Sequence, residues 1–126
     1  MAQNKCLFNH GIDTVIIRVS NIKEARKWYC EVLGLTPVWD DPVDDLVVFE
    51  TGGMTSLTIW QSDQPIKVDK KTGSYPIFKT TEIEKAYQQL KDKDVNVDEL
   101  VDETLLKYFF FYDKDGNILE ACEVEQ

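Results

Sequence analysis

The sequence contains few of the residues from which metal sites and nucleophilic sites are built. It has a single histidine, His10, and three widely spaced cysteines, Cys6, Cys30 and Cys122, with no CxxC pair. Zinc sites draw on closely spaced cysteine and histidine ligands, so no such site is indicated. A Ser-His-Asp set and a glycine-rich phosphate loop are also absent, so these catalytic and nucleotide-binding signatures give no lead.

Positive charge and long apolar runs are scarce as well. Fourteen Lys and Arg residues stand against 23 Asp and Glu residues, which gives a formal net charge of -9. Nucleic acids and anionic membrane surfaces both bind clustered Lys and Arg, so we expect neither as a partner. No apolar run resembles a signal peptide or reaches the roughly 20 residues that cross a membrane. An odd number of cysteines without a secretion signal predicts reduced thiols and a cytoplasmic location.

The sequence does contain a repeat. Residues 13–25 and 74–86 share one pattern, with an offset of 61 residues that pairs Ile22 with Ile83. Each copy has a short apolar strand, a polar helix start and an amphipathic helix. A repeat of this length usually means that neither half buries its apolar face alone. In a chain of 126 residues, which suits one domain, the repeat predicts two halves around a shared pocket.

Alternation, helical spacing and turn residues predict the same order of elements in both halves. Ser20 or Asn21 is the expected N-cap of a first helix that ends at Gly34, and Gly116 is the expected positive-φ residue of a hairpin turn at 113–117. A second helix is expected at 82–93, and strands are expected at 12–19, 36–40, 46–51, 56–61, 75–80, 95–101, 105–112 and 117–124. Each half is therefore β-α-β-β-β. We expect a single domain over residues 1–126, built of a module at 12–61 and a module at 75–124 joined by a polar linker at 62–74.

Two segments carry a family resemblance that covers nearly the whole chain. Ile22-x-x-Ala25-x-x-Trp28-Tyr29-x-x-Val32-Leu33-Gly34-Leu35 and Phe111-Tyr112-Asp113-Lys114-Asp115-Gly116-Asn117-Ile118-Leu119-Glu120 resemble the FYxxxLG and F-x-D-P-D-G-N-x-x-E segments of the vicinal oxygen chelate superfamily. This is the group of glyoxalases, bleomycin-resistance proteins and extradiol dioxygenases. Lys114 stands where the family usually has proline. The resemblance implies an α+β fold in which the two modules form a cup-shaped mixed sheet.

The resemblance also implies where a metal would bind in metal-dependent members. The four ligand positions fall at Thr14, Thr58, Tyr75 and Glu120, and of these only Glu120 is a typical ligand. Divalent transition metals prefer imidazole or carboxylate donors, usually three or more. We therefore expect no metal and no other cofactor, while a metal set that includes His10 through a shifted register stays open.

Our first hypothesis is a small-molecule-binding protein of the glyoxalase and bleomycin-resistance type, which acts by sequestration or as a carrier or sensor. Strand alternation and the resemblance together predict the residues that line the cup. These are Thr14, Ile16, Ser56, Thr58, Trp60, Tyr75, Ile77, Tyr108, Phe110, Ile118 and Glu120. Arg18 and Lys79 share these strand faces and could hold an anionic group, but we expect both to point into water.

The alternative is an enzyme, a glyoxalase-like lyase or isomerase or a dioxygenase. In that hypothesis Glu120 is the candidate catalytic residue, acting as acid and base or as a metal ligand. A metal-free acid-base pair of Glu120 and Tyr75 is a third option. The resemblance suggests a homodimer, since many members pair modules between chains. The identity of the ligand and the dimer interface are not encoded in any pattern that we find.

Overall fold

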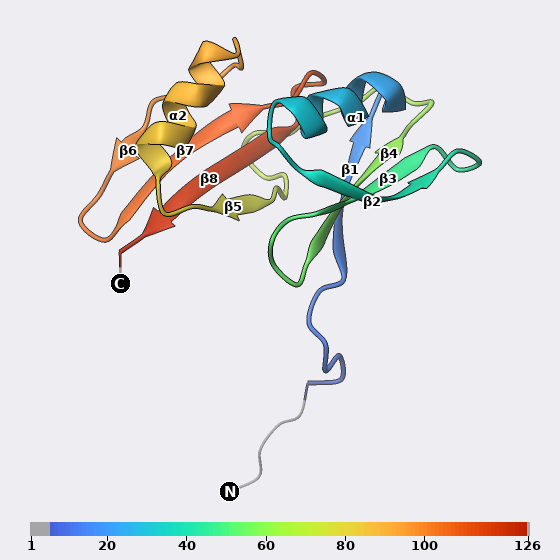
Figure 1. The fold of residues 1–126 in the computed structure, drawn as a ribbon, viewed down its shortest axis with the longest axis horizontal. Coiled ribbons are helices and arrows are strands. Elements are labelled where there is room, and N and C mark those ends of the chain that lie inside the picture. The colour runs from blue at the N-terminus through green and yellow to red at the C-terminus, as the bar shows by residue number, and fades with distance from the viewer. Residues whose placement is uncertain (1–5, 126) are drawn as a thin grey trace, which may run out of the picture.

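The computed structural model describes residues 6–125, which form two helices and eight strands (Figure 1). The first half contains β1 (Thr14–Val19), α1 (Ile22–Glu31), β2 (Thr36–Asp41), β3 (Leu46–Glu50) and β4 (Ser56–Gln61). The second half contains β5 (Ile77–Lys79), α2 (Ile83–Asp92), β6 (Val101–Asp102), β7 (Leu106–Tyr112) and β8 (Ile118–Val124). Neither helix is long and apolar enough to span a bilayer.

The strands form two sheets of four, with the orders β1-β4-β3-β2 and β5-β8-β7-β6. In each sheet the first and last strands of the half are parallel neighbours and the remaining pairs are antiparallel. The pairing register is also the same, since Ile16 lies opposite Thr58 and Ile77 lies opposite Glu120. The α+β fold of two β-α-β-β-β units with mixed sheets is confirmed.

Both helices begin in the same way. The backbone N–H of Ile22 donates to Oε1 of Gln61 at 2.9 Å, and the N–H of Ile83 donates to Oε1 of Glu123 at 2.9 Å. In each half, a side chain near the end of the strand that pairs with the first strand thus satisfies one of the unpaired amides of the helix start. Of the two expected N-caps, Ser20 and Asn21, it is Asn21 that caps α1, because its side chain accepts from the N–H of Glu24 at 3.0 Å.

Two predicted strands are shorter than the sequence suggested. The strand expected at 95–101 is reduced to β6 and an isolated bridge between Val97 and Phe111. Asp94 takes a left-handed φ of 58°, and the carboxylate of Asp98 accepts from the Tyr112 hydroxyl at 2.7 Å. The backbone of this segment still bonds to β7, through the N–H of Asp98 to Phe110 at 2.8 Å and the N–H of Tyr112 to Asn96 at 3.1 Å, but not as a continuous ladder. The strand expected at 75–80 begins only at Ile77, after a proline that has no N–H to donate.

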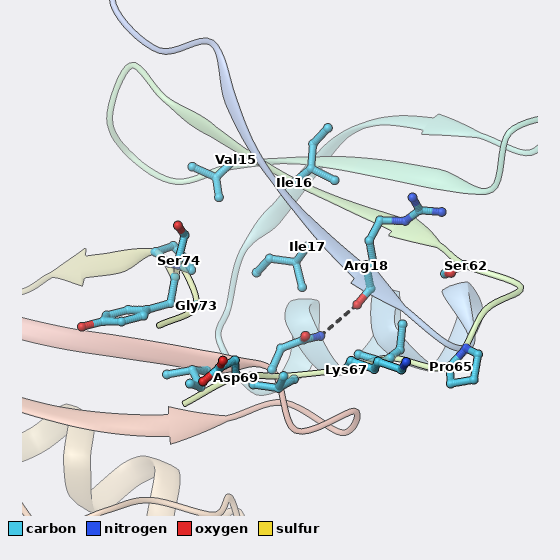
Figure 2. Close-up of a pocket in the computed structure, with 16 residues that line it drawn as sticks. Val15, Ile16, Ile17, Arg18, Ser62, Pro65, Lys67, Asp69, Gly73 and Ser74 are labelled. Carbon is cyan, nitrogen blue, oxygen red and sulfur yellow. Dashed lines mark hydrogen bonds between the residues drawn. The ribbon is translucent and has the colours of Figure 1, made fainter. Parts of the chain in front are cut away.

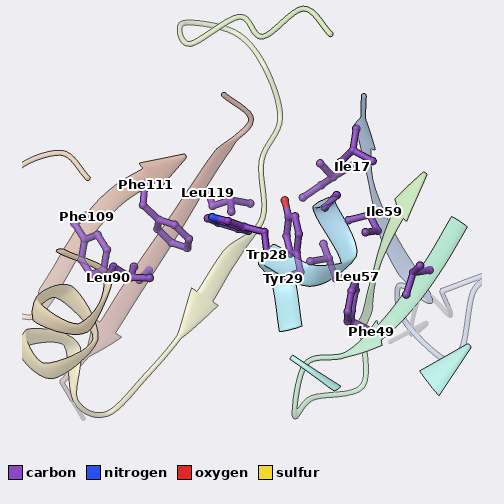
Figure 3. Close-up of a cluster of buried hydrophobic side chains, with 14 of the residues drawn as sticks. Ile17, Trp28, Tyr29, Phe49, Leu57, Ile59, Leu90, Phe109, Phe111 and Leu119 are labelled. Carbon is purple, nitrogen blue, oxygen red and sulfur yellow. The ribbon is translucent and has the colours of Figure 1, made fainter. Parts of the chain in front are cut away.

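One hydrophobic core runs through both halves. Tyr29 stacks on Phe49 in the first half at 5.9 Å between ring centroids, and Tyr87 packs edge-on against Phe109 in the second at 4.9 Å. Trp28 of α1 lies between Tyr29 and Leu119 of β8 (Figure 3). Because buried residues of both sheets belong to this one cluster, we expect the two halves to support each other's folding.

The predicted hairpin turn at 113–117 joins the two halves. Gly116 has the expected positive φ of 81°. The buried carboxylate of Asp113 accepts from the Tyr29 hydroxyl at 2.7 Å, and Asp115 accepts from the backbone N–H of Ser20 at 3.0 Å. The side-chain amide of Asn117 donates to the backbone carbonyl of Arg18 at 2.9 Å. Three side chains of one turn are therefore bonded to α1 and to the end of β1.

A second connection joins the ends of the helices. Nζ of Lys93, which follows α2, donates to the backbone carbonyls of Glu31 and Val32 at 3.1 Å each. These carbonyls lie at the end of α1, where the helix dipole favours a positive charge. Lys93 and the turn at 113–117 thus hold α1 at two points.

Candidate functional site

The outer face of the first sheet, opposite α1, carries a pair of threonine hydroxyls. Oγ1 of Thr14 and Oγ1 of Thr58 are 2.7 Å apart, and the Thr14 hydroxyl also donates to the carbonyl of Ser56 at 3.2 Å. If Thr14 donates to Ser56, the Thr58 hydroxyl donates to Thr14. Both hydroxyl protons are then used within the sheet.

Trp60 lies further along the same face and is covered on one side by Arg18. The Arg18 guanidinium carbon is 4.2 Å from the ring centroid of Trp60, which is a cation–π contact. Nε and Nη2 of Arg18 donate to the carbonyls of Trp60 and Gln61 at 3.1 and 2.9 Å. Arg18 is exposed, as expected, but its guanidinium is engaged by the end of β4.

The outer face of the second sheet carries Glu120 among aromatic rings. Glu120 is only 8% exposed and lies opposite Ile77 and Phe110 in the ladders. The Tyr75 ring packs edge-on against Phe110, with 5.6 Å between centroids. Burial raises the pKa of the Glu120 carboxyl, and the neighbouring Tyr75 hydroxyl acts in the opposite direction. The site therefore contains a carboxylate that is easier to protonate than usual.

The predicted cup residues fall into separate groups. A cavity beside β1 is lined by three of them, Ile16, Tyr75 and Ile118. Another cavity, of about 600 Å³ between the start of β4 and β5, is lined by Ser56 and Ile77. The other six predicted residues line neither cavity and lie on the two outer sheet faces: Thr14, Thr58, Trp60, Tyr108, Phe110 and Glu120.

The cavity beside β1 has a volume of about 620 Å³ and lies between β1, the segment 62–76 and the start of β8 (Figure 2). The sequence pattern predicted residues 62–74 only as a linker, but they also line one side of this cavity. The signal for this was the presence of Pro65, Ile66 and Val68 in an otherwise polar stretch. Gly73 lies so close to the backbone of Asp69 that a Cβ would be 2.6 Å from the Asp69 carbonyl oxygen. This contact folds the segment into a tight loop beside the cavity.

The free edge of β1 forms another wall of this cavity. The N–H groups of Ser56 and Ser62 donate to the carbonyls of Asp13 and Val19, so the odd-numbered residues of β1 pair with β4. The backbone groups of Ile16 and Arg18 consequently point to the other side, where both residues line the cavity. The carbonyl of Arg18 already accepts a hydrogen bond from the side-chain amide of Asn117. The N–H and C=O of Ile16 are left facing the space that a ligand would occupy.

The side chains at the four implied metal positions do not fit a transition metal. Thr14 and Thr58 are neutral and bonded to each other, which leaves Glu120 as the only anionic donor. Across residues 6–125 no three His, Cys, Asp or Glu side chains come together as a possible metal cluster. His10 is exposed and precedes β1. No metal-dependent step follows from this arrangement.

Comparison with known families agrees with the fold and the doubled unit. The chain belongs to the Glyoxalase/Bleomycin resistance protein/Dioxygenase superfamily, whose family model matches residues 11–121. A search of the curated proteins finds no match. The expected family is confirmed, and the family includes both binding proteins and enzymes.

Solved structures show how widely this fold is used. A glyoxalase family protein from Enterococcus faecalis is 25% identical, with a TM-score of 0.73 over 89% of this chain and 96% of that chain. TnmS3, an antibiotic binding protein from Streptomyces sp. CB03234, is 20% identical, with a TM-score of 0.75 over 96% and 100%. A lactoylglutathione lyase from Agrobacterium tumefaciens is 19% identical, with a TM-score of 0.71 over 90% and 92%. The fold therefore does not decide between binding and catalysis.

Proposed function

We propose that this protein binds a small organic molecule in the cavity beside β1 and acts by sequestration or as a carrier or sensor. The observation that carries the proposal is the cavity itself. Its volume of about 620 Å³ lies within the range of roughly 300–1,000 Å³ that is typical of ligand sites. The similarity in fold to an antibiotic binding protein supports the same function.

The apolar walls of the cavity would supply most of the binding free energy, and a few polar groups would orient the ligand. Val15, Ile17 and Ile118 supply apolar surface, whose burial contributes about 25 cal/mol per Å². The backbone of Ile16 offers one donor and one acceptor that fix the orientation of the ligand. Tyr75 lines the cavity and packs on Phe110, so a ligand that extends past it reaches the outer face that carries Glu120.

Filling the cavity tests the proposal. Ser74 is exposed and lines the cavity, so Ser74→Trp fills part of the space without disturbing the core. With the neutral fluorescent probe N-phenyl-1-naphthylamine, we expect saturable binding at one site per chain and a loss of about tenfold or more in affinity for Ser74→Trp. Gln64→Trp is the matched control, since Gln64 is an exposed residue of the same segment that does not line the cavity. No saturable binding, or equal binding by both variants, would refute the proposal.

A second candidate function is acid-base catalysis without a metal. The buried Glu120 carboxyl with its raised pKa, next to Tyr75, favours it. Glu120 would accept a proton from a carbon beside a carbonyl group, while the Tyr75 hydroxyl would donate a hydrogen bond to the carbonyl oxygen.

The hemithioacetal of methylglyoxal and glutathione tests this second candidate. Metal-depleted protein with EDTA present is expected to turn it over, and Glu120→Gln is expected to abolish turnover while the circular dichroism spectrum is retained. Glu123→Gln is the control, because Glu123 is near in sequence but binds the start of α2. Absence of turnover by the unmodified chain rejects this candidate for that substrate.

We also propose a cytoplasmic homodimer. Large apolar side chains are exposed on both sheets, with exposed fractions of 51% for Ile16, 53% for Ile77 and 60% for Trp39. A second copy would cover them, and could bring one chain's first sheet opposite the other's second sheet. The three cysteines are free, which supports a reducing compartment.

Light scattering during size-exclusion chromatography tests the dimer. We expect twice the chain mass of 14.6 kDa and a shift toward monomer for Trp39→Ser. Val43→Ser is the control, because Val43 is 87% exposed at the tip of the same hairpin. A monomer at all concentrations contradicts the proposal.

A further inference from the structure

The charged residues that line the cavity beside β1 are Arg18, Lys67 and Asp69. Two of them are engaged elsewhere. Figure 2 shows the Arg18 guanidinium directed away from the segment that carries Lys67, and it is bonded to carbonyls at the end of β4. Asp69 accepts from the Thr72 hydroxyl at 2.6 Å and from the N–H groups of Lys71 and Thr72 at 2.9 and 3.2 Å. These bonds hold the pKa of Asp69 below its ordinary value and tie its carboxylate to its own loop.

Lys67 is the charged group that remains for a ligand. It lies between Pro65 and Asp69 along the wall formed by the linker (Figure 2). Within residues 6–125 the ion pairs of lysine involve Lys85 and Lys107, and the hydrogen bonds of lysine ammonium groups involve Lys93 and Lys107. The Lys67 ammonium is in neither group.

The other polar groups at the cavity are neutral and include both donors and acceptors, so Lys67 is the group there that selects for charge. The N–H and the C=O of Ile16 both face the space, while the carbonyl of Arg18 already accepts from the side-chain amide of Asn117. The remaining lining is dominated by aliphatic side chains, among them Val15, Ile17, Ile66 and Val68. A ligand that matches this lining has an apolar body and one group that accepts hydrogen bonds and carries negative charge.

Resting on the binding function proposed above, we propose that the ligand is an amphipathic organic anion whose acidic group binds Lys67. The apolar body lies against the aliphatic walls, and the acidic group lies at the linker side of the cavity. Neutral molecules of the same shape bind there more weakly, because they leave the ammonium without a partner.

Two fluorescent probes with one scaffold test this ligand class. 8-Anilino-1-naphthalenesulfonate carries a sulfonate that N-phenyl-1-naphthylamine lacks. We expect the unmodified chain to bind the sulfonate about tenfold more tightly, the size of one charge-assisted hydrogen bond. Lys67→Gln is expected to remove this preference, so that the two probes bind with equal affinity. Lys71→Gln, which removes the same charge from an exposed position outside the cavity, is expected to retain it.

The possible failures are distinguishable. Equal affinity of the two probes for the unmodified chain, or an equal loss of sulfonate affinity in Lys67→Gln and Lys71→Gln, overturns the anion proposal and leaves the binding function standing. Sulfonate binding that survives Ser74→Trp places the anion outside this cavity and also overturns it. Failure of both probes to bind the unmodified chain overturns the binding function and the anion proposal together.

Discussion

The two halves of the chain have the same backbone arrangement and different side chains at equivalent positions. Thr58 and Glu120 occupy the same place in the register, opposite Ile16 and Ile77. In the first half the neighbouring hydroxyl is Thr14, 2.7 Å from Thr58, and both groups are neutral. In the second half the group is a buried carboxyl beside Tyr75. The repeat therefore preserves geometry, while at these equivalent positions the ionisable carboxyl occurs in the second half.

The turns at 51–55 and 113–117 differ in the same way. Both connect the last two antiparallel strands of their half. The Thr51 hydroxyl donates to the carbonyl of Thr55 at 2.6 Å, and the turn is open enough to leave Met54 90% exposed. Asp113 instead reaches Tyr29, 84 residues away. The turn of the second half is therefore bonded to the first half, whereas the hydroxyl of Thr51 is bonded within its own turn.

The strongest test of the comparison concerns the shared core. Leu57 and Leu119 are equivalent and are 2% and 0% exposed. We expect Leu57→Ala and Leu119→Ala each to lower the free energy of unfolding by about 3 kcal/mol, through lost burial and a cavity. Both should shift one cooperative transition, because one core serves both halves. Urea unfolding monitored by tryptophan fluorescence and by circular dichroism checks this; two separate transitions would show independent halves.

The next largest difference in the free energy of unfolding is expected between variants of the two turns. Asp113→Ala is expected to cost about 2 kcal/mol, because it leaves the buried Tyr29 hydroxyl without its acceptor. Thr51→Ala removes one local hydrogen bond and is expected to cost roughly 0.5–1 kcal/mol. Denaturant unfolding of the two variants measures the difference. A cost for Thr51→Ala that equals that of Asp113→Ala would remove the distinction between the turns.

A smaller difference in stability is expected between variants at the starts of the two helices. α1 has a capping bond from Asn21 in addition to Gln61, whereas Glu82 at the N-cap of α2 makes no side-chain capping bond. We expect Glu123→Ala to cost about 1 kcal/mol and Gln61→Ala to cost less. Thermal unfolding of matched samples compares them, and the reverse order would contradict the capping argument.

The smallest effect is the pH dependence at the Thr58 and Glu120 positions. The pKa of folded Glu120 is raised, so its contribution to stability is complete below the unfolded pKa of a glutamate and is lost as pH rises through the folded pKa. Relative to the unmodified chain, Glu120→Gln should therefore gain stability between about pH 4 and pH 7. Thr58→Val has no titrating group to remove and should show no such trend. Unfolding curves at several pH values distinguish the two.

The sequence predicted those features that depend on neighbouring residues. A capped helix start at residue 20 or 21, the positive φ at Gly116 and the repeat offset all follow from local chemistry or spacing, and all are present. The assignment of alternate residues to sheet faces also follows from a period of two. None of these depends on how the two sheets are oriented.

The cavity could not be predicted, because it depends on that orientation. Tyr29 and Asp113 set the position of the turn against α1 from residues 84 apart, and no local pattern encodes such a pairing. The linker at 62–74 becomes a wall only once β1 and β8 have been placed on either side of it. The strand expected at 95–101 failed for a related reason, since the carboxylate of Asp98 binds Tyr112 on another strand.

The hydrogen bonds from the turn at 113–117 also bear on solubility. β1 is an edge strand, and an unpaired edge is a template on which other chains can add a strand and aggregate. The side chains of Asn117 and Asp115 occupy the carbonyl of Arg18 and the N–H of Ser20, which lie on that edge. Only a short stretch around Ile16 is left to receive another strand, and the linker lies across it. The same five-residue turn thus joins the halves and shields an exposed edge from misassembly.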